Sequence, residues 1–474
     1  MQNLQSCLSV RAENSSLTFQ ELRETEYSRL DERKQVYLDY TGGGLYARSQ
    51  IESYVELLQR SIIGNPHSQS PASIRGTQMV EETRLKILNF FNADEQEYAV
   101  VFSSNATGAI KLVAESYPFR NNSVYALTAD NHNSINGVRE YAMKKEAHVR
   151  YIPLNENLEV DDIESGLPAV RDSAPSLFAY PAQSNFSGIQ HPLDWIDFAH
   201  SKGYDVLLDA AAYVPTNRLD LGIFKPEFVP ISFYKMFGFP TGIGALLIKH
   251  SLMDRLSRPW FSGGTIQHVT TMHPSHSEAD SVQRFEDGTV DYLGIPGVAI
   301  GLEFLRKIGM ERIHQHVMSL TSDFLREVES LTHSNGRKMI SVYGPSNALA
   351  RGGTVAFNVV SPEGVPIDFR VVGEHAAKSN ISIRTGCFCN PGAGEYAFGF
   401  SPEREKACLH RLSKDFTPEL FSECISGSAK GAVRASFGVA TNDFDINSLV
   451  RLLKTFRDYS HAQDDEKRLP PLSC

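Results

Sequence analysis

The sequence has little of what secreted, membrane-spanning or nucleic-acid-binding proteins require. Its 474 residues include only 6 Cys, too few for a disulfide scaffold. No apolar run approaches the length of a membrane span, and residues 1–16 lack the apolar core of a signal peptide. Lys and Arg number 46 against 56 Asp and Glu, so no overall positive field attracts nucleic acid or anionic lipid. We therefore expect a cytoplasmic globular protein that binds neither nucleic acid nor membrane.

What the chain does contain is a regular alternation of short apolar runs and helix-like segments. Runs typical of buried strands lie at 98–102, 123–128, 148–152, 176–180, 205–209 and 228–233. Helical patterns cover 73–91, 107–116, 134–145, 193–202 and 297–308. The alternation predicts an α/β fold in which helices cover both faces of a parallel sheet. Beyond about residue 300, longer helices at 310–332 and 444–461 accompany strands near 339–343, 354–360, 381–385 and 431–437, which indicates a smaller α+β domain.

Three predicted strands end in side chains suited to a small ligand, which open α/β sheets bind beyond the carboxyl ends of their strands. Ala106 and Thr107 begin a helix, where free N–H groups favour a phosphate, although an ordinary helix cap is the alternative. Asp209 could hold a protonated ring nitrogen or cap a helix. Lys235 follows an apolar strand, where desolvation would lower its pKa and favour Schiff-base chemistry; the alternative is a surface lysine. Their order, with Lys235 about 26 residues after Asp209, predicts a pyridoxal phosphate site.

These residues belong to a longer series of motifs, at 130–134, 181–188, 229–244, 285–289, 384–390 and 433–438. In this series the sequence resembles the class V, fold type I pyridoxal-phosphate enzymes, and most closely the cysteine-desulfurase-like N-terminal domain of molybdenum cofactor sulfurases. The resemblance implies a large cofactor-binding domain at 35–295 with a mostly parallel sheet of the seven-stranded type. It also implies a small domain formed by 1–34 and 296–474, without the C-terminal molybdenum-cofactor-binding domain of full-length sulfurases.

The resemblance assigns a role to each candidate residue. Lys235 forms the Schiff base with the cofactor, Asp209 pairs with its pyridine nitrogen, and His132 stacks on the ring. Asn185 lies near the substrate and a cofactor oxygen. The phosphate-binding positions are the backbone at Ala106, the side chains of Thr107, Ser232 and Tyr234, and Gly288 and Thr289, which reach the neighbouring subunit's phosphate and so imply a homodimer.

Two arginines complete the expected site. Arg434 matches the family's ligand for the substrate α-carboxylate, because a guanidinium can bind a carboxylate through two parallel hydrogen bonds. Arg384 stands beside the cysteine motif in the substrate site, where its charge would favour a thiolate. Ala212 departs from the family, since many desulfurases have a Gln there that contacts the cofactor. No metal is expected.

Cys387 and Cys389 lie on a Gly/Pro-rich loop after a predicted strand. Cys389 occupies the position of the nucleophilic cysteine of desulfurases, and Cys387 an additional position of the sulfurase pattern. Three alternatives remain from the residues alone. The pair could ligate zinc with Cys408, His410 or Cys424; it could form a strained disulfide; or it could be buried packing.

The function implied by the resemblance is a pyridoxal-phosphate-dependent cysteine desulfurase or sulfurtransferase. It would convert L-cysteine to L-alanine, form a persulfide on Cys389 and pass the sulfur to an acceptor such as molybdenum cofactor. A first alternative is a lyase, an aminotransferase or a decarboxylative carbon–carbon bond-forming enzyme with the same cofactor. A second is a scaffold that kept the fold and lost catalysis.

Overall fold

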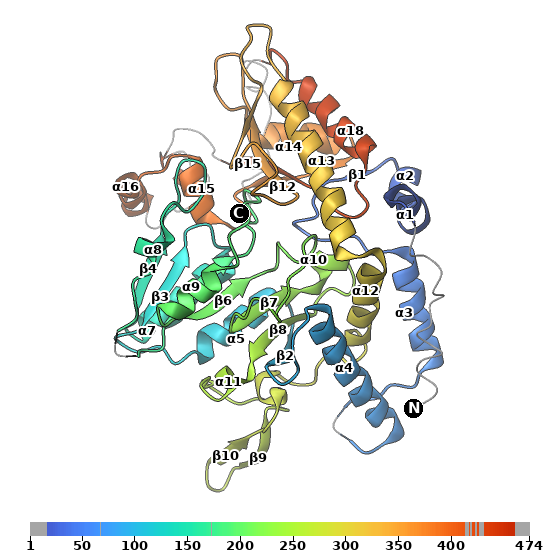
Figure 1. Ribbon diagram of the computed structural model, residues 1–474, viewed down its shortest axis with the longest axis vertical. Coiled ribbons are helices and arrows are strands. Elements are labelled where there is room, and N and C mark those ends of the chain that lie inside the picture. Colours follow the sequence, from blue (N-terminus) through green and yellow to red (C-terminus); the bar gives the residue numbers. More distant parts are fainter. Residues whose placement is uncertain are drawn as a thin grey trace.

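The computed structural model describes residues 17–66, 68–171, 173–412, 417, 420–421, 424–425 and 431–459. Residues 1–16 and 460–474 of the expected small domain therefore lie outside the described residues, as does the end of the helix expected at 444–461. Two β-sheets organise the chain, a large one flanked by helices and a smaller one beneath α13 (Met310–Ser330), α14 (Phe369–Lys378) and α18 (Asp443–Lys454) (Figure 1).

The large sheet has seven strands, and most of them are parallel. In spatial order they are β2 (Tyr98–Ser103), β8 (Gly244–Lys249), β7 (Phe228–Ser232), β6 (Asp205–Asp209), β5 (Leu177–Pro181), β3 (Val124–Thr128) and β4 (His148–Ile152). Only β8 runs antiparallel to its neighbours. The sequence patterns predicted the other six strands but not β8. A five-residue helix, α10 (Phe233–Phe237), and a short turn separate β7 from β8, so the chain reverses direction without the crossover that a parallel pair requires.

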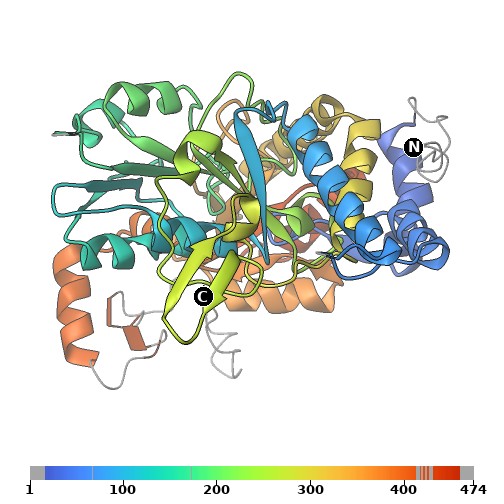
Figure 2. The same ribbon diagram turned by 90° about the horizontal axis from the view of Figure 1, so that it is seen from below.

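Alternating side chains of the strands pack into two different cores, as expected for a sheet covered on both faces. On β2, Ala99 and Val101 join one core with α5 (Ala106–Ser116), α7 (Val138–Lys144) and α11 (His250–Met253). Val100 and Phe102 join the other core with α4 (Pro71–Phe90), α9 (Trp195–Ser201) and α12 (Ile295–Ile308). The view from below shows the helices in layers on either side of this sheet (Figure 2).

The smaller sheet is antiparallel, in the order β11 (Ile340–Val342), β12 (Thr354–Val359), β15 (Ala432–Ser436) and β14 (Arg384–Gly386). Close by, β1 (Val36–Tyr37) pairs in parallel with β13 (Ile381–Ser382), and Asp39 forms a bridge with Ser436 of β15. A segment from the start of the described chain thereby reaches the sheet formed near its end. The predicted strand near 381–385 is two short strands, β13 and β14.

The remaining elements connect or flank the two sheets. They are α1 (Phe19–Glu26), α2 (Arg29–Glu32), α3 (Arg48–Arg60), α6 (Asn133–Asn136), α8 (Ile163–Gly166), the 3-10 helix at Val282–Phe285, α15 (Pro391–Ala397), α16 (Pro402–Leu412), and the hairpin of β9 (Ile266–Thr270) and β10 (Ser275–Glu278). The hairpin projects from the body of the molecule (Figure 1). Among the described helices, none is both long and apolar enough to cross a bilayer.

Candidate active site

A cavity of about 160 Å³ lies at the carboxyl ends of β5, β6 and β7. Ligands are expected at this edge of an α/β sheet. Among the residues that line the cavity are Ala106, Thr107, His132, Asn185, Asp209, Ser232, Tyr234 and Lys235. The structure therefore brings together predicted residues from widely separated segments of the chain.

Lys235 lies on α10, directly after β7. The segment before α3 packs tightly against this helix: the N–H of Gly44 donates to the carbonyl of Tyr234 at 3.0 Å, and a Cβ at Gly44 would approach the carbonyl oxygen of Lys235 to 2.9 Å. The surrounding protein removes water from the ammonium group and so lowers the pKa of Lys235, while Asp209 opposes this shift. The neutral amine, which is the nucleophilic form, is favoured.

Asp209 is the last residue of β6 and is 8% exposed. Its Oδ1 accepts a hydrogen bond from the N–H of Ala211 at 3.0 Å. No helix begins there, since residues 211–216 form turns, so the helix-cap alternative is wrong. In the described chain no protein group donates to Oδ2, which leaves a carboxylate oxygen at the cavity for a cationic N–H.

The start of α5 and the end of β7 together present hydroxyl and N–H groups to the cavity. The N–H of Ala106 donates to Ser232 Oγ at 2.9 Å, and Thr107 Oγ1 lies 2.8 Å from Ser134 Oγ. Because a helix N-terminus carries partial positive charge, this set of donors suits an anionic group. Ser134 lines the cavity too, although the sequence analysis gave it no role.

A glycine allows α5 to begin so close to the sheet. Gly244, the first residue of β8, lies against Asn105, and a Cβ there would come within 2.5 Å of the Asn105 Cα. The Asn105 side chain caps α5 by accepting a hydrogen bond from the N–H of Gly108 at 2.9 Å. The cap satisfies only one of the free N–H groups, so it does not exclude anion binding at this helix start, which stays a prediction.

His132 precedes α6 and reaches the cavity from another side. Its Nδ1 accepts a hydrogen bond from the N–H of Ser134 at 3.1 Å, which places the ring proton of a neutral imidazole on Nε2. Burial lowers the pKa of His132; Asp209 opposes this shift and Lys235 adds to it. A neutral ring is suited to stacking on a flat ligand.

Arg434 and Arg384 lie directly opposite each other on β15 and β14. Like charges at such positions repel, and Asp39 lies between them: it accepts hydrogen bonds from Arg384 Nη2 at 2.7 Å and from Arg434 Nη2 at 3.1 Å. Burial lowers the pKa of Arg434 to about 10, whereas its hydrogen bonds to Asp39 raise the pKa of the half-exposed Arg384. A Cβ at Gly42 would come within 2.5 Å of Asp39 Oδ2, so a side chain there would displace the carboxylate from its place between the arginines.

The cysteine loop joins β14 to α15 and reaches the same site. The Asn185 side chain donates through Nδ2 to the carbonyl of Phe388 at 2.7 Å, and the N–H of Asn133 donates to the carbonyl of Cys389 at 2.8 Å. Cys389 is partly exposed. A thiolate at this position raises the pKa of both Lys235 and Arg434, although neither the cysteine nor the arginines line the cavity itself.

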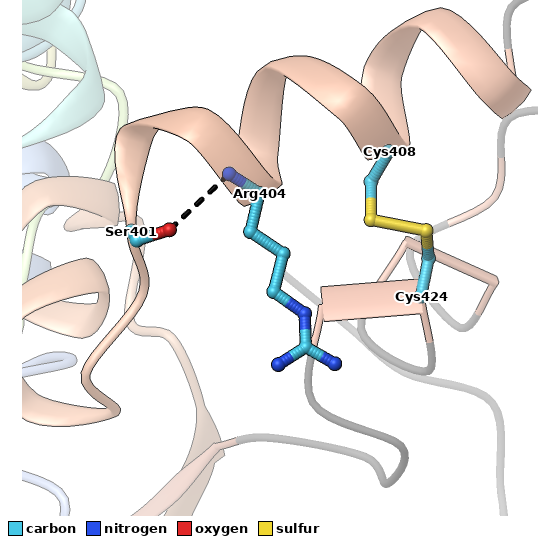
Figure 3. Close-up of a disulfide and its surroundings, with 4 residues drawn as sticks. All are labelled: Ser401, Arg404, Cys408 and Cys424. Carbon is cyan, nitrogen blue, oxygen red and sulfur yellow. Dashed lines mark hydrogen bonds between the residues drawn. A yellow bond between two sulfur atoms is a disulfide. The ribbon is translucent and has the colours of Figure 1, made fainter.

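Cys408 and Cys424 bond to each other in a disulfide, with a Cα–Cα distance of 5.8 Å (Figure 3). Neither therefore supplies a thiolate for the zinc site considered from the sequence, whereas Cys387 and Cys389 do not form a disulfide. The sequence analysis missed this pairing because 16 positions separate the two cysteines. Their spacing in the sequence did not indicate that α16 places Cys408 next to Cys424.

Gly288 and Thr289 are not among the residues that line this cavity. Gly288 instead lines a second, smaller one with Arg84 and Glu286, which form a buried ion pair at 2.8 Å. The contribution of these two residues to a neighbouring subunit's site stays a prediction.

The sequence matches the model of one protein family over residues 36–449, that of aminotransferase class-V. The chain belongs to this family. Among curated members of similar sequence, the molybdenum cofactor sulfurases of Bos taurus and Homo sapiens are each 36% identical to it over 94% of its length. The match covers 53% and 52% of those two proteins, so this class-V chain spans about half the length of these relatives.

Solved structures show the same fold. An apo cysteine desulfurase from Thermococcus onnurineus NA1 matches the class-V chain with a TM-score of 0.76 at 23% identity, covering 93% of this chain and 98% of that one. A cysteine desulfurase from Escherichia coli matches with a TM-score of 0.73 at 20% identity and the same coverage. These matches confirm the expected fold type I architecture of pyridoxal-phosphate enzymes.

Proposed function

We propose that the chain is a pyridoxal-phosphate-dependent cysteine desulfurase or sulfurtransferase, which converts L-cysteine to L-alanine and passes the sulfur to an acceptor. One observation carries the proposal: the loop of Cys389 lies beside the cavity of Lys235 and Asp209. Arg434 contacts both this loop and a residue that lines the cavity. The family match and the sulfurase and desulfurase relatives support the same activity.

The donors present in the cavity fit pyridoxal phosphate. Lys235 offers an amine for the aldehyde, Asp209 an oxygen for the ring N–H, and His132 a neutral ring for stacking. The phosphate would bind at Ala106, Thr107, Ser232 and Tyr234, close to the start of α5. When bound, the cofactor withdraws electrons from the α-carbon of an amino acid.

The chain's own residues would carry out the remaining steps. Arg434, with Arg384 beside it, orients the substrate carboxylate, and Asn185 lies next to the reacting atoms. The amine of Lys235 takes the α-proton and later returns a proton to the product. The thiolate of Cys389 attacks the substrate sulfur; the carbon–sulfur bond breaks, its electron pair stays with the substrate, and a persulfide remains on Cys389.

The same proposal covers the domain bounds, the oligomeric state, the location and the sulfur acceptor. We infer a large cofactor-binding part at 35–295 and a small part at 1–34 and 296–474. We also infer a cytoplasmic homodimer in which Gly288 and Thr289 reach the partner's phosphate. Molybdenum cofactor is the proposed acceptor, because the curated relatives of similar sequence are molybdenum cofactor sulfurases.

The proposal predicts that the purified protein releases alanine from L-cysteine when a thiol reductant is present. Cys389→Ala should abolish this release, whereas the matched variant Cys387→Ala should keep most of it. Incubation with cysteine without reductant, followed by intact-mass and peptide analysis, should find one added sulfur on Cys389.

The absence of alanine from the wild-type reaction would disprove the desulfurase. Alanine release that survives in Cys389→Ala would remove the proposed nucleophile. Turnover of cysteine to pyruvate, or of other amino acids, independently of Cys389 would favour the lyase or aminotransferase alternative.

A further inference from the structure

The cysteine loop has a backbone conformation that its contacts must maintain. Phe388 and Cys389 have φ angles of +57° and +54°. Residues with a side chain rarely adopt this left-handed region, and two in succession are less favourable still. Such backbone persists only where surrounding contacts stabilise it.

Phe388 makes several of those contacts. Its side chain is 6% exposed, and its ring packs against the ring of Phe186 at a centroid distance of 5.3 Å. On the other side, the central carbon of the Arg434 guanidinium lies 4.7 Å from the centroid of the Phe388 ring. The side chain of Phe388 therefore helps to hold the loop in place, and it contacts Arg434, the residue expected to bind the substrate carboxylate.

Arg434 has a second connection to the loop. Its Nη1 donates to the carbonyl of Asn185 at 2.8 Å, and the side chain of the same Asn185 binds the loop at Phe388. Asn390 adds a hydrogen bond to Asn185 Oδ1 at 2.9 Å. The buried Nε of Arg434 has no partner in the described chain, so one edge of the guanidinium carries a hydrogen-bond donor that no described protein group uses, while its face contacts the ring.

The charge of the guanidinium is what attracts it to the ring. A cation–π contact depends on the positive charge above the aromatic face. Asp39 already pairs with Arg434, and a carboxylate bound at the edge of the guanidinium adds a second negative charge that neutralises more of the positive charge. Carboxylate binding thus weakens the contact that stabilises the left-handed backbone at Phe388 and Cys389.

We propose that Phe388 is a positioning residue that couples carboxylate binding at Arg434 to release of the Cys389 loop. This inference rests on the proposed function in one respect, the binding of the substrate carboxylate by Arg434. Without substrate, the stacked ring fixes the loop; with a carboxylate bound, the loop loosens and the thiol moves toward the substrate sulfur. The thiol is thereby released only when an amino acid is in place.

Alkylation of Cys389 in the holoenzyme tests the coupling directly. The rate with iodoacetamide is compared in saturating L-alanine and in saturating L-alaninamide, which has the same amino group and no carboxylate. Cofactor absorbance confirms that each ligand is bound, and tandem mass spectrometry separates label on Cys389 from label on Cys387. In the wild type we expect the rate with alanine to exceed that with alaninamide by roughly fivefold.

Phe388→Leu should bring that ratio down to about one, because the π face is lost, and should raise the rate without ligand. Phe388→Tyr should restore the wild-type ratio. The matched control is Phe398→Leu: Phe398 packs on the same Phe186, at 6.1 Å, and makes no cation–π contact with Arg434. Its ratio should stay as in the wild type.

A wild-type ratio of one, or an unchanged ratio in Phe388→Leu, would overturn the inference. If Phe388→Leu does not fold, as judged by thermal melting, Phe388→Met provides the same loss of the π face with more of the volume retained. The alkylation ratio and alanine release are independent measurements. If the alkylation rate with alanine exceeds that with alaninamide but no alanine is released from cysteine, the coupling stands and the desulfurase function is disproved. If alanine is released but the ratio is one, the desulfurase function stands and the coupling is disproved.

Discussion

The edge of the seven-stranded sheet and the loop after β14 hold their side chains at the same site in different ways. At the sheet edge, Asp209 ends one buried strand and Lys235 lies on the short helix that follows another, so the sheet fixes their positions. In the loop, Phe388 and Cys389 have left-handed backbone that is held by side-chain contacts and by the hydrogen bond from the Asn133 N–H to the Cys389 carbonyl. The proposed function would place chemistry that needs a fixed group at the sheet edge and chemistry that needs a moving group on the loop.

The largest expected effect comes from removing the fixed amine. Lys235→Ala should lower turnover by at least ~1,000-fold, since both the cofactor linkage and the proton transfer are lost. The visible absorbance of the bound cofactor should change at the same time. Lys225→Ala is the matched control, because Lys225 precedes β7 and pairs with Glu97. Equal activity in both variants would show that the sheet edge does not carry the reaction.

An intermediate effect is expected where the two regions meet. Arg434→Lys should lower kcat/KM for cysteine by about 10- to 100-fold, mostly through KM, because an ammonium cannot replace the two parallel hydrogen bonds of a guanidinium. Arg384→Lys should lower it by less than about fivefold, since half-exposed ion pairs contribute little. Steady-state kinetics of both variants measures the difference. A larger effect at Arg384 would assign the substrate carboxylate to that residue instead.

The smallest effect is expected from removing the disulfide that follows the cysteine loop in the sequence. Replacing Cys408 and Cys424 together by Ser should leave kcat/KM within about twofold of the wild type, because sites without shared partners act independently. Single-turnover kinetics without reductant, at several cysteine concentrations, is the measurement, since the disulfide is then intact in the reference protein. A tenfold or greater loss would mean that the segment after α15 takes part in positioning Cys389.

The residues at the sheet edge could be predicted because simple rules connect them to the sequence. An apolar run followed by Asp209 or Lys235 is visible in the sequence, and the carboxyl ends of parallel strands meet at one edge of the sheet. Strand β8 escaped prediction because its antiparallel direction depends on a short connection. Only the packing of Gly244 against Asn105 reveals why the strand must begin with glycine.

The contacts around Arg434 could not be predicted in the same way. Asp39 reaches both arginines only because β1 pairs with β13, far along the chain. No local pattern signals that pairing. The same holds for Phe388, whose contact with Arg434 depends on two left-handed residues in succession. The resemblance to desulfurases located Cys389, but it assigned no role to the aromatic residue before it.

The disulfide between Cys408 and Cys424 gives the protein two covalent states that a desulfurase assay will interconvert. A thiol that discharges a persulfide also attacks sulfur–sulfur bonds, and it meets this one through the partly exposed Cys424, since Cys408 is buried. We therefore expect multiple turnovers under reductant to come from a chain with the disulfide open, and a single turnover without reductant from a chain with the disulfide intact. Mass spectrometry distinguishes the two forms by two hydrogens, so each rate can be assigned to its own species.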